Sequence, residues 1–372
     1  MKASFVFLLI ILLFSKQSIA QSSYPWDRPL NMAWSADGIN FGASAVFQDS
    51  AGVPSVLRWK GDTLVAVFQW FRLPKPSPSW DRVAVKFSYD KGINWTSPVP
   101  VVFSGLPSSY QRPFDPTLAV INKDSLRIYF SSGNGMPKTL DSTVNTYSAI
   151  SADGINFDFE SDARVDVSTL PVIDPAVIYF NNSWHYAAPA GKPQDGAYHY
   201  VSPDGLHFSA VPKIMSDSLH NWTGNYMKDS DTEMRFYGSG KNIWYNASIN
   251  GGVWKGYTAT NVEGGDPSVV KIDANNYLMI YVGKTYATHI ALTQATKSAL
   301  SIYPNPSQDK IQVECTLSNR SLSYSIIDFS GKILLNGVLN QDLTEINISS
   351  LLNGQYQFIL ENGESFPFAI LK

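Results

Sequence analysis

The sequence SADGINF at residues 35–41 is the strongest indication of the fold, because close copies of it occur four more times along the chain. Each copy has a Ser, any residue, an Asp or Asn, a Gly one or two places further on, and then an aromatic residue. The other copies are SYDKGINW (88–95), SADGINF (151–157), SPDGLHF (202–208) and SINGGVW (248–254). Recurrence at intervals of about 45 to 65 residues indicates a repeated architecture.

Each copy has the chemistry of a hairpin turn. An Asp or Asn side chain caps backbone N–H groups, and Gly takes the positive φ that other residues avoid. Strand-like runs flank the copies, such as RVAVKFS before the second copy and VPVVF after it. Because a four-stranded blade fits this spacing, the sequence predicts an all-β protein with one propeller blade per motif.

The repeat resembles the Asp-box, or BNR repeat, of sialidases and related β-propellers. The copy at 88–95 has the full spacing Ser-x-Asp-x-Gly-x-x-Trp, and the others are one residue shorter. The resemblance implies the propeller fold, since the box is a folding device and indicates little about activity.

Five inner strands are expected, which predicts a five-bladed propeller. They begin at VPSVLRW (53–59), FDPTLAVI (114–121), IDPAVIYF (173–180), GNYMKD (224–229) and GDPSVVKI (265–272). The N-terminal hairpin at residues 30–47 has no inner strand of its own, so we expect it to pair with the last blade and close the ring. The run ATHIALTQ (287–294) has the pattern of a further strand, which leaves a six-bladed ring open.

Composition and the first residues indicate an exported protein. Residues 1–20 are typical of a secretory signal peptide, with Lys2, the apolar run FVFLLIILLF and small residues before Gln21. No later apolar run is long enough for a membrane-spanning helix. The single cysteine, Cys315, excludes an intramolecular disulfide. A net charge of −3 without charged blocks argues against a nucleic-acid partner.

The tail from about Leu300 is a separate module, whose alternating pattern and Gly turns predict a β-sandwich of about seven strands. It resembles the type A C-terminal sorting domain of the type IX secretion system. The matching residues are Tyr303-Pro304-Asn305-Pro306, Asp328 with Gly331-Lys332, Leu351 with Gly354-Gln355-Tyr356, and Lys372. The resemblance implies passage through the outer membrane of a Gram-negative bacterium, ending in release or retention at the cell surface. The alternative is a carbohydrate-binding or adhesive sandwich.

These observations predict three segments: a signal peptide (1–20), a β-propeller (21–297) and a C-terminal sorting domain (298–372). The type IX secretion machinery is the partner that the tail implies.

Acidic residues are predicted to converge at the end of the propeller opposite the repeated turns. Inner strands start there, and the loops between second and third strands lie there too. The aspartates of this end are Asp115, Asp174 and Asp266 in Asp-Pro pairs, and Asp81, Asp141 and Asp195 in the loops. The same rim carries Arg72, Arg112, Trp70 and Trp80. Glycoside hydrolysis takes two carboxyl groups, one protonated and one ionised, while Trp stacks on sugars and Arg holds their polar groups.

Each of these aspartates also has a purely structural interpretation. Asp-Pro is a turn signal, in which the carboxylate caps free N–H groups and Pro sets φ. For Asp81 the two interpretations weigh equally, whereas Asp141 and Asp195 are mostly structural. The histidines show no metal-binding spacing, so no cofactor is predicted, although carboxylates in a channel could also hold a calcium ion.

Two glycosidase families resemble different parts of this region. The Asp-Pro inner strands resemble the five-bladed arabinanases, xylosidases and invertases, which carry an Asp base, a second Asp and a Glu acid on three successive blades. The corresponding residues here are Val53, Asp115 and Asp174. Residues 52–95 resemble the first blade of sialidases, where Arg72 and Asp81 match family positions. Gly52 replaces the leading arginine, which argues against a sialic acid substrate.

The sequence therefore predicts a secreted glycosidase-like propeller that acts on or binds an extracellular poly- or oligosaccharide. Asp115 and Asp81 are the predicted carboxyl pair, with Asp174 in support. The predicted substrate-binding residues are Arg72, Arg112, Trp70, Trp80 and Asp266. The alternatives are a non-catalytic propeller that binds a glycan or a protein at the cell surface, and a purely adhesive protein.

Overall fold

The computed structural model describes residues 28–71, 80–133, 142–283, 300–315, 321–328, 332–360 and 365–372. Within these ranges every regular element is a strand except a 3-10 turn at Pro193–Asp195. The chain divides into two compact units, Met1–Ala287 and Thr288–Lys372, which are called the first and second units below.

The described part of the first unit consists of antiparallel sheets that follow one another along the chain. The first sheet contains β3 (Ala51–Arg58), β4 (Leu64–Phe71), β5 (Trp80–Ser88) and β6 (Val99–Pro100). The second contains β8 (Phe114–Asn122), β9 (Ser125–Gly133), β10 (Val144–Ser151), β11 (Asn156–Val165) and, parallel to β11, β7 (Val102–Ser104). The third contains β12 (Ala176–Phe180), β13 (Ser183–Pro189), β14 (Ala197–Ser202) and β15 (Ser209–Ala210).

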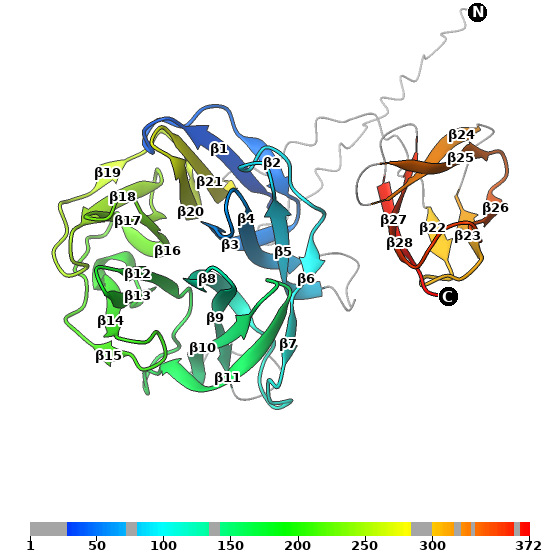
Figure 1. The fold of residues 1–372 in the computed structure, drawn as a ribbon. Helices are drawn as coiled ribbons and strands as arrows, with labels where there is room; N and C mark the ends of the chain where they lie inside the picture. The colour runs from blue at the N-terminus through cyan, green and yellow to red at the C-terminus, as the bar shows by residue number, and fades with distance from the viewer. Residues whose placement is uncertain are drawn as a thin grey trace, which may run out of the picture. The chain divides into compact units, whose positions relative to one another are not determined.

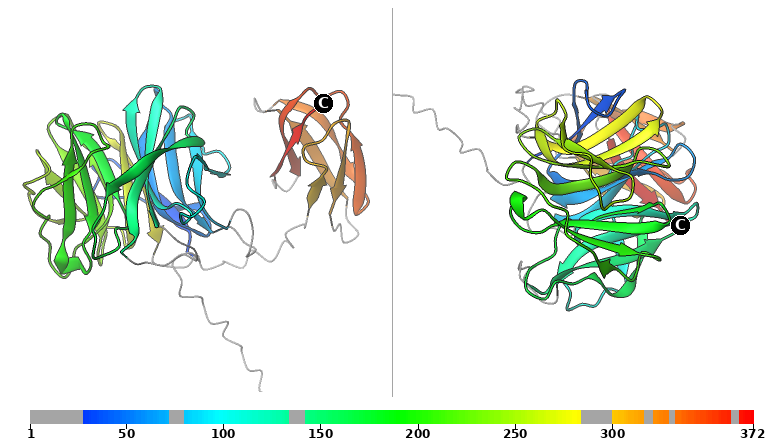
Figure 2. Two further views of the ribbon diagram at one scale, coloured as in Figure 1. Left: turned by 90° about the horizontal axis from the view of Figure 1, so that it is seen from below. Right: turned by 90° about the vertical axis from the view of Figure 1, so that its left-hand side faces the viewer.

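Two further sheets complete the described part of this unit. The fourth contains β16 (Asn221–Lys228), β17 (Met234–Ser239), β18 (Trp244–Ser248) and β19 (Thr258–Ala259). The fifth contains β20 (Gly264–Asp273), β21 (Asn276–Gly283), β1 (Leu30–Ser35) and β2 (Ala45–Gln48). The inner strand of each sheet contacts the inner strand of the next, and β20 contacts β3. The sheets are arranged around a common axis (Figures 1 and 2), which confirms the predicted propeller fold.

The fifth sheet joins the two ends of the first unit. β1 runs antiparallel to β21, with Leu30 opposite Val282 and Ser35 opposite Tyr277. The N-terminal hairpin therefore pairs with the last sheet as predicted, and it covers the edge that β21 would otherwise expose. The run at 287–294 lies outside the described residues, so the choice between five and six blades stays a prediction.

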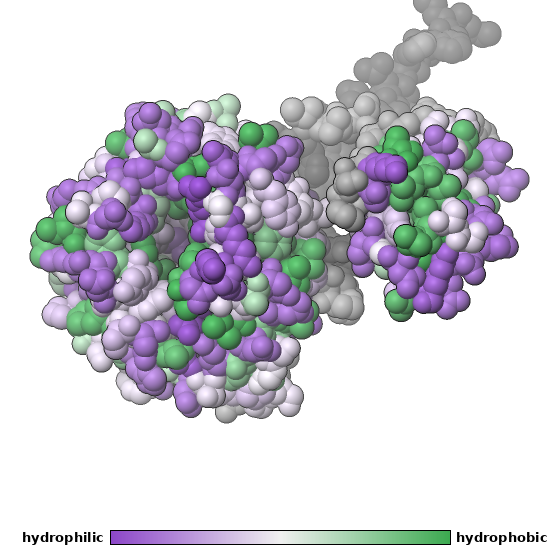
Figure 3. Space-filling model, in the orientation of Figure 1, coloured by the Kyte–Doolittle hydropathy of each residue, from purple (hydrophilic) through white to green (hydrophobic). Residues whose placement is uncertain are grey.

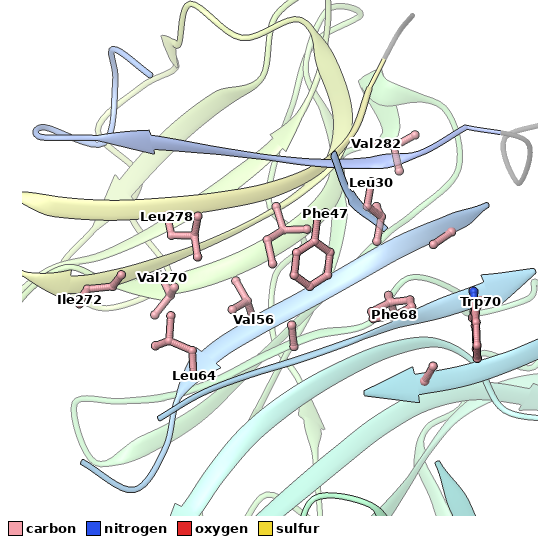
Figure 4. Packing of buried hydrophobic residues seen from close by; sticks show 14 residues of the cluster. Leu30, Phe47, Val56, Leu64, Phe68, Trp70, Val270, Ile272, Leu278 and Val282 are labelled. Carbon is pink, nitrogen blue, oxygen red and sulfur yellow. The ribbon is translucent and has the colours of Figure 1, made fainter. Parts of the chain in front are cut away.

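The core of the first unit lies between neighbouring sheets. Figure 4 shows one such layer, in which Val270 and Leu278 of the fifth sheet face Val56 and Leu64 of the first. Residues 64–70 of β4 are all buried, because this strand has a sheet against each of its faces. That explains why the second strands are almost continuously apolar rather than alternating.

The repeated motifs all form the same hydrogen-bonded turn, which joins the third strand of a sheet to its outer strand. In the copy at 151–157, Gly154 N donates to Ser151 Oγ at 2.8 Å. Asp153 Oδ1 accepts from Ile155 N at 2.7 Å and Asn156 N at 2.8 Å. Asp153 Oδ2 also accepts from Asn156 Nδ2 at 2.8 Å. Although burial alone would raise it, the bonds from Asn156 and Ile155 hold the pKa of Asp153 at about 2. Gly154 has a φ of 78°, and a Cβ there would lie 3.1 Å from Phe87 of the preceding sheet. The turn at 151–157 thus packs against the preceding sheet of the ring.

The second unit is a two-layer sandwich. One sheet contains β22 (Ser301–Tyr303), β23 (Lys310–Glu314) and β26 (Leu343–Asn347). The other contains β25 (Ile333–Leu339), β24 (Leu322–Ile327), β27 (Gly354–Leu360) and β28 (Ser365–Ile370). Its buried cluster includes Ile326, Phe358 and Cys315, and Figure 3 shows further hydrophobic residues on its surface. The small β-sandwich predicted from the sequence is confirmed.

Candidate functional site

Four of the five inner strands described in the first unit, β3, β8, β12 and β20, begin with a shared backbone elbow. Val53, Asp115, Asp174 and Asp266 each precede a proline, with φ of 47°, 50°, 54° and 45°. Positive φ is rare outside glycine, and the β-branched Val53 is strained there. A β-bulge coincides with this elbow at β3, β8 and β20. The fold therefore stores strain at one end of the inner strands, and three of these positions hold a carboxyl group.

The three aspartates of these elbows act on one another electrostatically. Burial, together with the carboxylates of Asp115 and Asp266, raises the pKa of Asp174 well above its usual value. Burial and the charge of Asp115 raise the pKa of Asp266 to about 6, against a smaller opposing effect of Arg28. The structure thus brings Asp115, Asp174 and Asp266 into one group, which we call the aspartate cluster.

Little free space remains between the inner strands at this end. A cavity of about 10 Å³ is bounded by Val53, Asp174, Asp266 and their neighbours. A cavity of this size holds about one water molecule. A sugar would therefore have to lie over the aspartate cluster and not between the strands.

A layer of polar side chains crosses the ring one step further along the inner strands. Thr117 Oγ1 donates to Asn225 Oδ1 at 2.8 Å, and Asn225 Nδ2 donates to the carbonyl of Pro54 at 3.0 Å. Ser55 and Ser268 add hydrogen bonds to the backbone of neighbouring inner strands. Asn225 borders both the small cavity and a larger one of about 400 Å³. The polar layer therefore separates the aspartate cluster from the larger cavity.

A second charged group lies between the first and second sheets. Asp81 sits in a bulge of β5 with a φ of 54°, and its Oδ1 accepts from Gln69 Nε2 at 2.6 Å. Burial and the charge of Arg112 lower the pKa of Arg82, while Asp81 opposes them. Asp81, Arg82 and Arg112 therefore lie close together. Arg82 and Gln69 were not predicted as site residues. The position of Arg82 directly after Asp81 is the feature of the sequence that could have indicated it.

The remaining predicted residues lie in different surroundings or outside the described residues. Trp70 is only 6% exposed and packs in the apolar layer of Figure 4, which leaves little of its ring for a sugar. Asp195 accepts from the backbone N–H of Lys192 at 2.9 Å within the 3-10 turn. Arg72, Asp141 and the side chain of Trp80 lie outside the described residues.

The described ranges show neither a cluster of metal ligands nor a membrane-spanning helix. They contain no group of three or more His, Cys, Asp or Glu side chains arranged to hold a metal ion. In the same ranges no helix has the length and apolar character needed to cross a membrane.

Comparison with known proteins identifies the second unit. Residues 301–367 match the family described as the secretion system C-terminal sorting domain. This match confirms the resemblance of the tail to a type IX sorting domain and indicates a protein exported by that system. No curated protein sequence matches the chain.

The solved structures that are similar to this chain include several glycosidases. A β-xylosidase has 13% identity and a TM-score of 0.45, with 62% of this chain and 91% of that chain covered. A family 32 β-fructofuranosidase of Bombyx mori has 13% identity and a TM-score of 0.47, covering 94% and 90%. The sialidase of Trypanosoma rangeli has 12% identity and a TM-score of 0.40, covering 64% and 56%. The chemistry of the site depends on the residues described above.

Proposed function

We propose that this protein is a secreted propeller that hydrolyses a glycosidic bond of an extracellular glycan at its aspartate cluster. The observation that carries the proposal is the raised pKa of Asp174 beside the carboxyl groups of Asp115 and Asp266. A carboxyl that keeps its proton beside one that is ionised is the pair that glycoside hydrolysis needs. In this proposal Asp174 donates the proton to the leaving oxygen.

The ionised partner comes from the pair predicted by the sequence. Asp115 belongs to the same cluster as Asp174, and Asp81 belongs to the neighbouring charged group. We assign the ionised role to Asp115, because its charge acts on both Asp174 and Asp266. Asp81 is then a substrate-binding carboxylate, held in place by Gln69. Arg72, Trp80 and Asp266 stay proposed substrate contacts.

Export supports an extracellular substrate. The proposed signal peptide would bring the chain across the inner membrane, and the sorting domain would direct it through the outer membrane. The mature protein then meets its glycan in the medium or at the cell surface of a Gram-negative bacterium.

A glycan screen on the purified full chain tests this proposal, with binding and released sugar measured in parallel. Asp174→Asn should lower sugar release by at least about 100-fold, because proton donation contributes roughly that much, while binding is retained. Asp158→Asn is the matched control, since Asp158 is exposed on β11. Release that persists at the wild-type rate in Asp174→Asn would refute the assigned acid.

A non-catalytic binding propeller is the second candidate. It is favoured by Val53, which occupies the fourth elbow without a carboxyl group, and by the 10 Å³ cavity beside it. Binding without any release in the wild-type protein, unchanged in Asp174→Asn, would establish this function instead.

A further inference from the structure

Ser239, the last residue of β17, is hydrogen-bonded to the backbone of two neighbouring sheets at the aspartate end of the ring. Its Oγ donates to the carbonyl of Thr223 in the fourth sheet at 2.9 Å. The same Oγ accepts from the N–H of Asp266 in the fifth sheet, also at 2.9 Å. The carbonyl of Ser239 accepts from Nε1 of the buried Trp244 at 2.8 Å, which holds the serine in place. Because Thr223 and Asp266 both border the 10 Å³ cavity, this hydroxyl connects two sheets beside the aspartate cluster.

Both backbone partners of Ser239 lie where the pairing of two strands is interrupted. The pairing of β16 with β17 has a shift that spans Thr223, and the pairing of β20 with β21 has a shift that spans Asp266. The extra residue of a bulge is left out of the hydrogen-bonded ladder, so its backbone groups need a partner from elsewhere. The Ser239 hydroxyl provides that partner for one carbonyl and for one N–H.

The carboxyl group of Asp266 projects from the backbone that Ser239 holds. Asp266 has a φ of 45°, and a residue with a Cβ keeps this conformation only where its surroundings impose it. The charges that act on Asp266 include those of Asp115 and Arg28, and its own charge acts on Asp174. A change in the elbow would therefore move a carboxyl group that helps Asp174 to keep its proton.

The second sheet offers an internal comparison, because Ser131 of β9 occupies the place that Ser239 has in β17. Each serine comes two residues after a tyrosine whose hydroxyl donates to a turn of the next sheet, Tyr129 and Tyr237 respectively. Ser131 is also buried, but its Oγ has no hydrogen-bond partner among the described residues. The two bonds of Ser239 are therefore not a general requirement of the ring, and they belong to the boundary that holds Asp266.

We propose that Ser239 is a positioning residue of the aspartate cluster, which holds the elbow of Asp266 so that the charge of this carboxyl acts on Asp174. The consequence for hydrolysis rests on the proposed function, whereas the effect on Asp266 does not. A hydroxyl suits this role, because the same atom donates one hydrogen bond and accepts another. Alanine removes both bonds at this position, and threonine keeps the hydroxyl that makes them.

Titration of the Asp266 carboxyl in the full chain tests the positioning directly. NMR of carboxyl-labelled aspartate follows the titration, and the signal that disappears in Asp266→Asn identifies the group. In Ser239→Ala the proton affinity of this carboxyl should fall about 10-fold or more, because the carboxyl leaves its buried place beside Asp115. Ser239→Thr should titrate like the wild type.

Ser131→Ala is the matched control, because it removes a hydroxyl from the same place in another sheet where that hydroxyl makes no described bond. It should leave the titration of Asp266 unchanged. A wild-type titration in Ser239→Ala, or an equal shift in both alanine variants, would overturn the proposal. If circular dichroism shows that Ser239→Ala does not fold, Ser239→Cys is measured in the same way, since a thiol is a weak acceptor.

The pH profile of sugar release adds a readout that a merely structural serine would not move. Ser239→Ala should shift the alkaline limb of kcat/KM to lower pH, because Asp174 loses a nearby charge that helps it to keep its proton. In the Asp266→Asn background the same substitution should leave the limb where it is. An equal shift in both backgrounds would mean that Ser239 does not act through Asp266.

Two outcomes separate this inference from the proposed function. If the titration of Asp266 shifts in Ser239→Ala but the wild type releases no sugar from any glycan, the positioning stands and the proposed hydrolysis fails. If sugar release depends on Asp174 while Asp266 titrates alike in Ser239→Ala and the wild type, the hydrolysis stands and the positioning fails.

Discussion

At the scale of single residues, the aspartate cluster combines two unfavourable features. Each aspartate has a positive φ, and each is brought next to another carboxyl group by the ring. Both features lower the stability of the fold. Residues that lower stability in this way are concentrated at functional sites, because selection for function retains them. A purely structural cap would gain hydrogen bonds to its carboxylate and would have a lowered pKa, as Asp153 does in its turn.

Replacing Asp266 by Asn should stabilise the protein at high pH. The folded-state pKa of Asp266 is about 6 against a usual 3.8, so ionisation in the folded state costs free energy as the pH rises from about 4 to 6. Asp266→Asn should therefore gain about 1–3 kcal/mol in the free energy of unfolding at pH 8 and nothing below pH 4. Asn also tolerates the positive φ. Urea unfolding at pH 8 and below pH 4 measures the gain in the free energy of unfolding. An equal gain at both pH values would contradict the raised pKa of Asp266.

At the scale of elements, the repeated turn shows how a short motif stabilises a whole ring. Its Ser and Asp satisfy the backbone within the turn, while its Gly allows the next sheet to approach. Tyr129 of β9 donates to the carbonyl of Gly205, and Tyr237 of β17 donates to that of Gly38. Turns on one sheet are thus hydrogen-bonded to strands of the preceding one.

Removing the turn carboxylate should weaken the first unit. Asp153→Ala loses the acceptor for Ile155 N and Asn156 N, and it should lower the free energy of unfolding by about 1–2 kcal/mol. Asp158→Ala, an exposed residue on the following strand, is the matched control and should change little. Comparable losses in both variants, measured by urea unfolding, would mean that the turn bonds contribute nothing specific.

The pairing of β13 with β14 stacks two buried histidines, with ring centroids 5.9 Å apart. Burial and the neighbouring His185 lower the pKa of His199 to about 4 from a usual 6.5, so His199 is neutral in the folded protein. Stability should therefore be lost as the pH falls from about 6.5 to 4, where the unfolded chain takes up protons first.

Between pH 7 and pH 4 the wild type should lose free energy of unfolding, and His199→Gln should reduce this loss by about 1–3 kcal/mol. Thermal unfolding at both pH values measures the difference. His207→Asn is the control, because Asn occupies the matching position in the turns that contain Asn40 and Asn156. If the stability of both variants falls with pH as that of the wild type does, the buried histidine pair does not cause the loss of stability in acid.

At the scale of the whole molecule, the two units have separate cores. Buried clusters of the first unit lie between its sheets, and the second unit has a cluster of its own within its sandwich. We therefore expect two calorimetric transitions. Phe68→Ala should lower the temperature of the transition of the first unit, and Phe358→Ala that of the second. Each substitution should reduce the free energy of unfolding of its unit by about 3–5 kcal/mol, because both side chains are fully buried. A single transition that shifts in both variants would show that the units unfold together.

Much of the architecture could be predicted because its signals are local. Turn residues at fixed offsets placed the repeats, and the absence of an inner strand in residues 30–47 predicted the pairing of β1 with β21. The candidate site was predicted less completely. Asp115, Asp174 and Asp266 could be found as strand-initial residues, but Arg82 gave no periodic signal, and the burial of Trp70 depends on the neighbouring sheet.

The propeller fold, the closing hairpin and the sorting domain could be predicted from the sequence, because turn chemistry, alternation and a matched tail are properties of neighbouring residues. Tertiary packing brings Asp115, Asp174 and Asp266 together, allows the charge of Arg112 to act on Arg82, and leaves a cavity of about 10 Å³ between the inner strands. These features arise where different sheets meet around the ring. Their distances depend on packing between residues far apart in the chain, which no local pattern encodes.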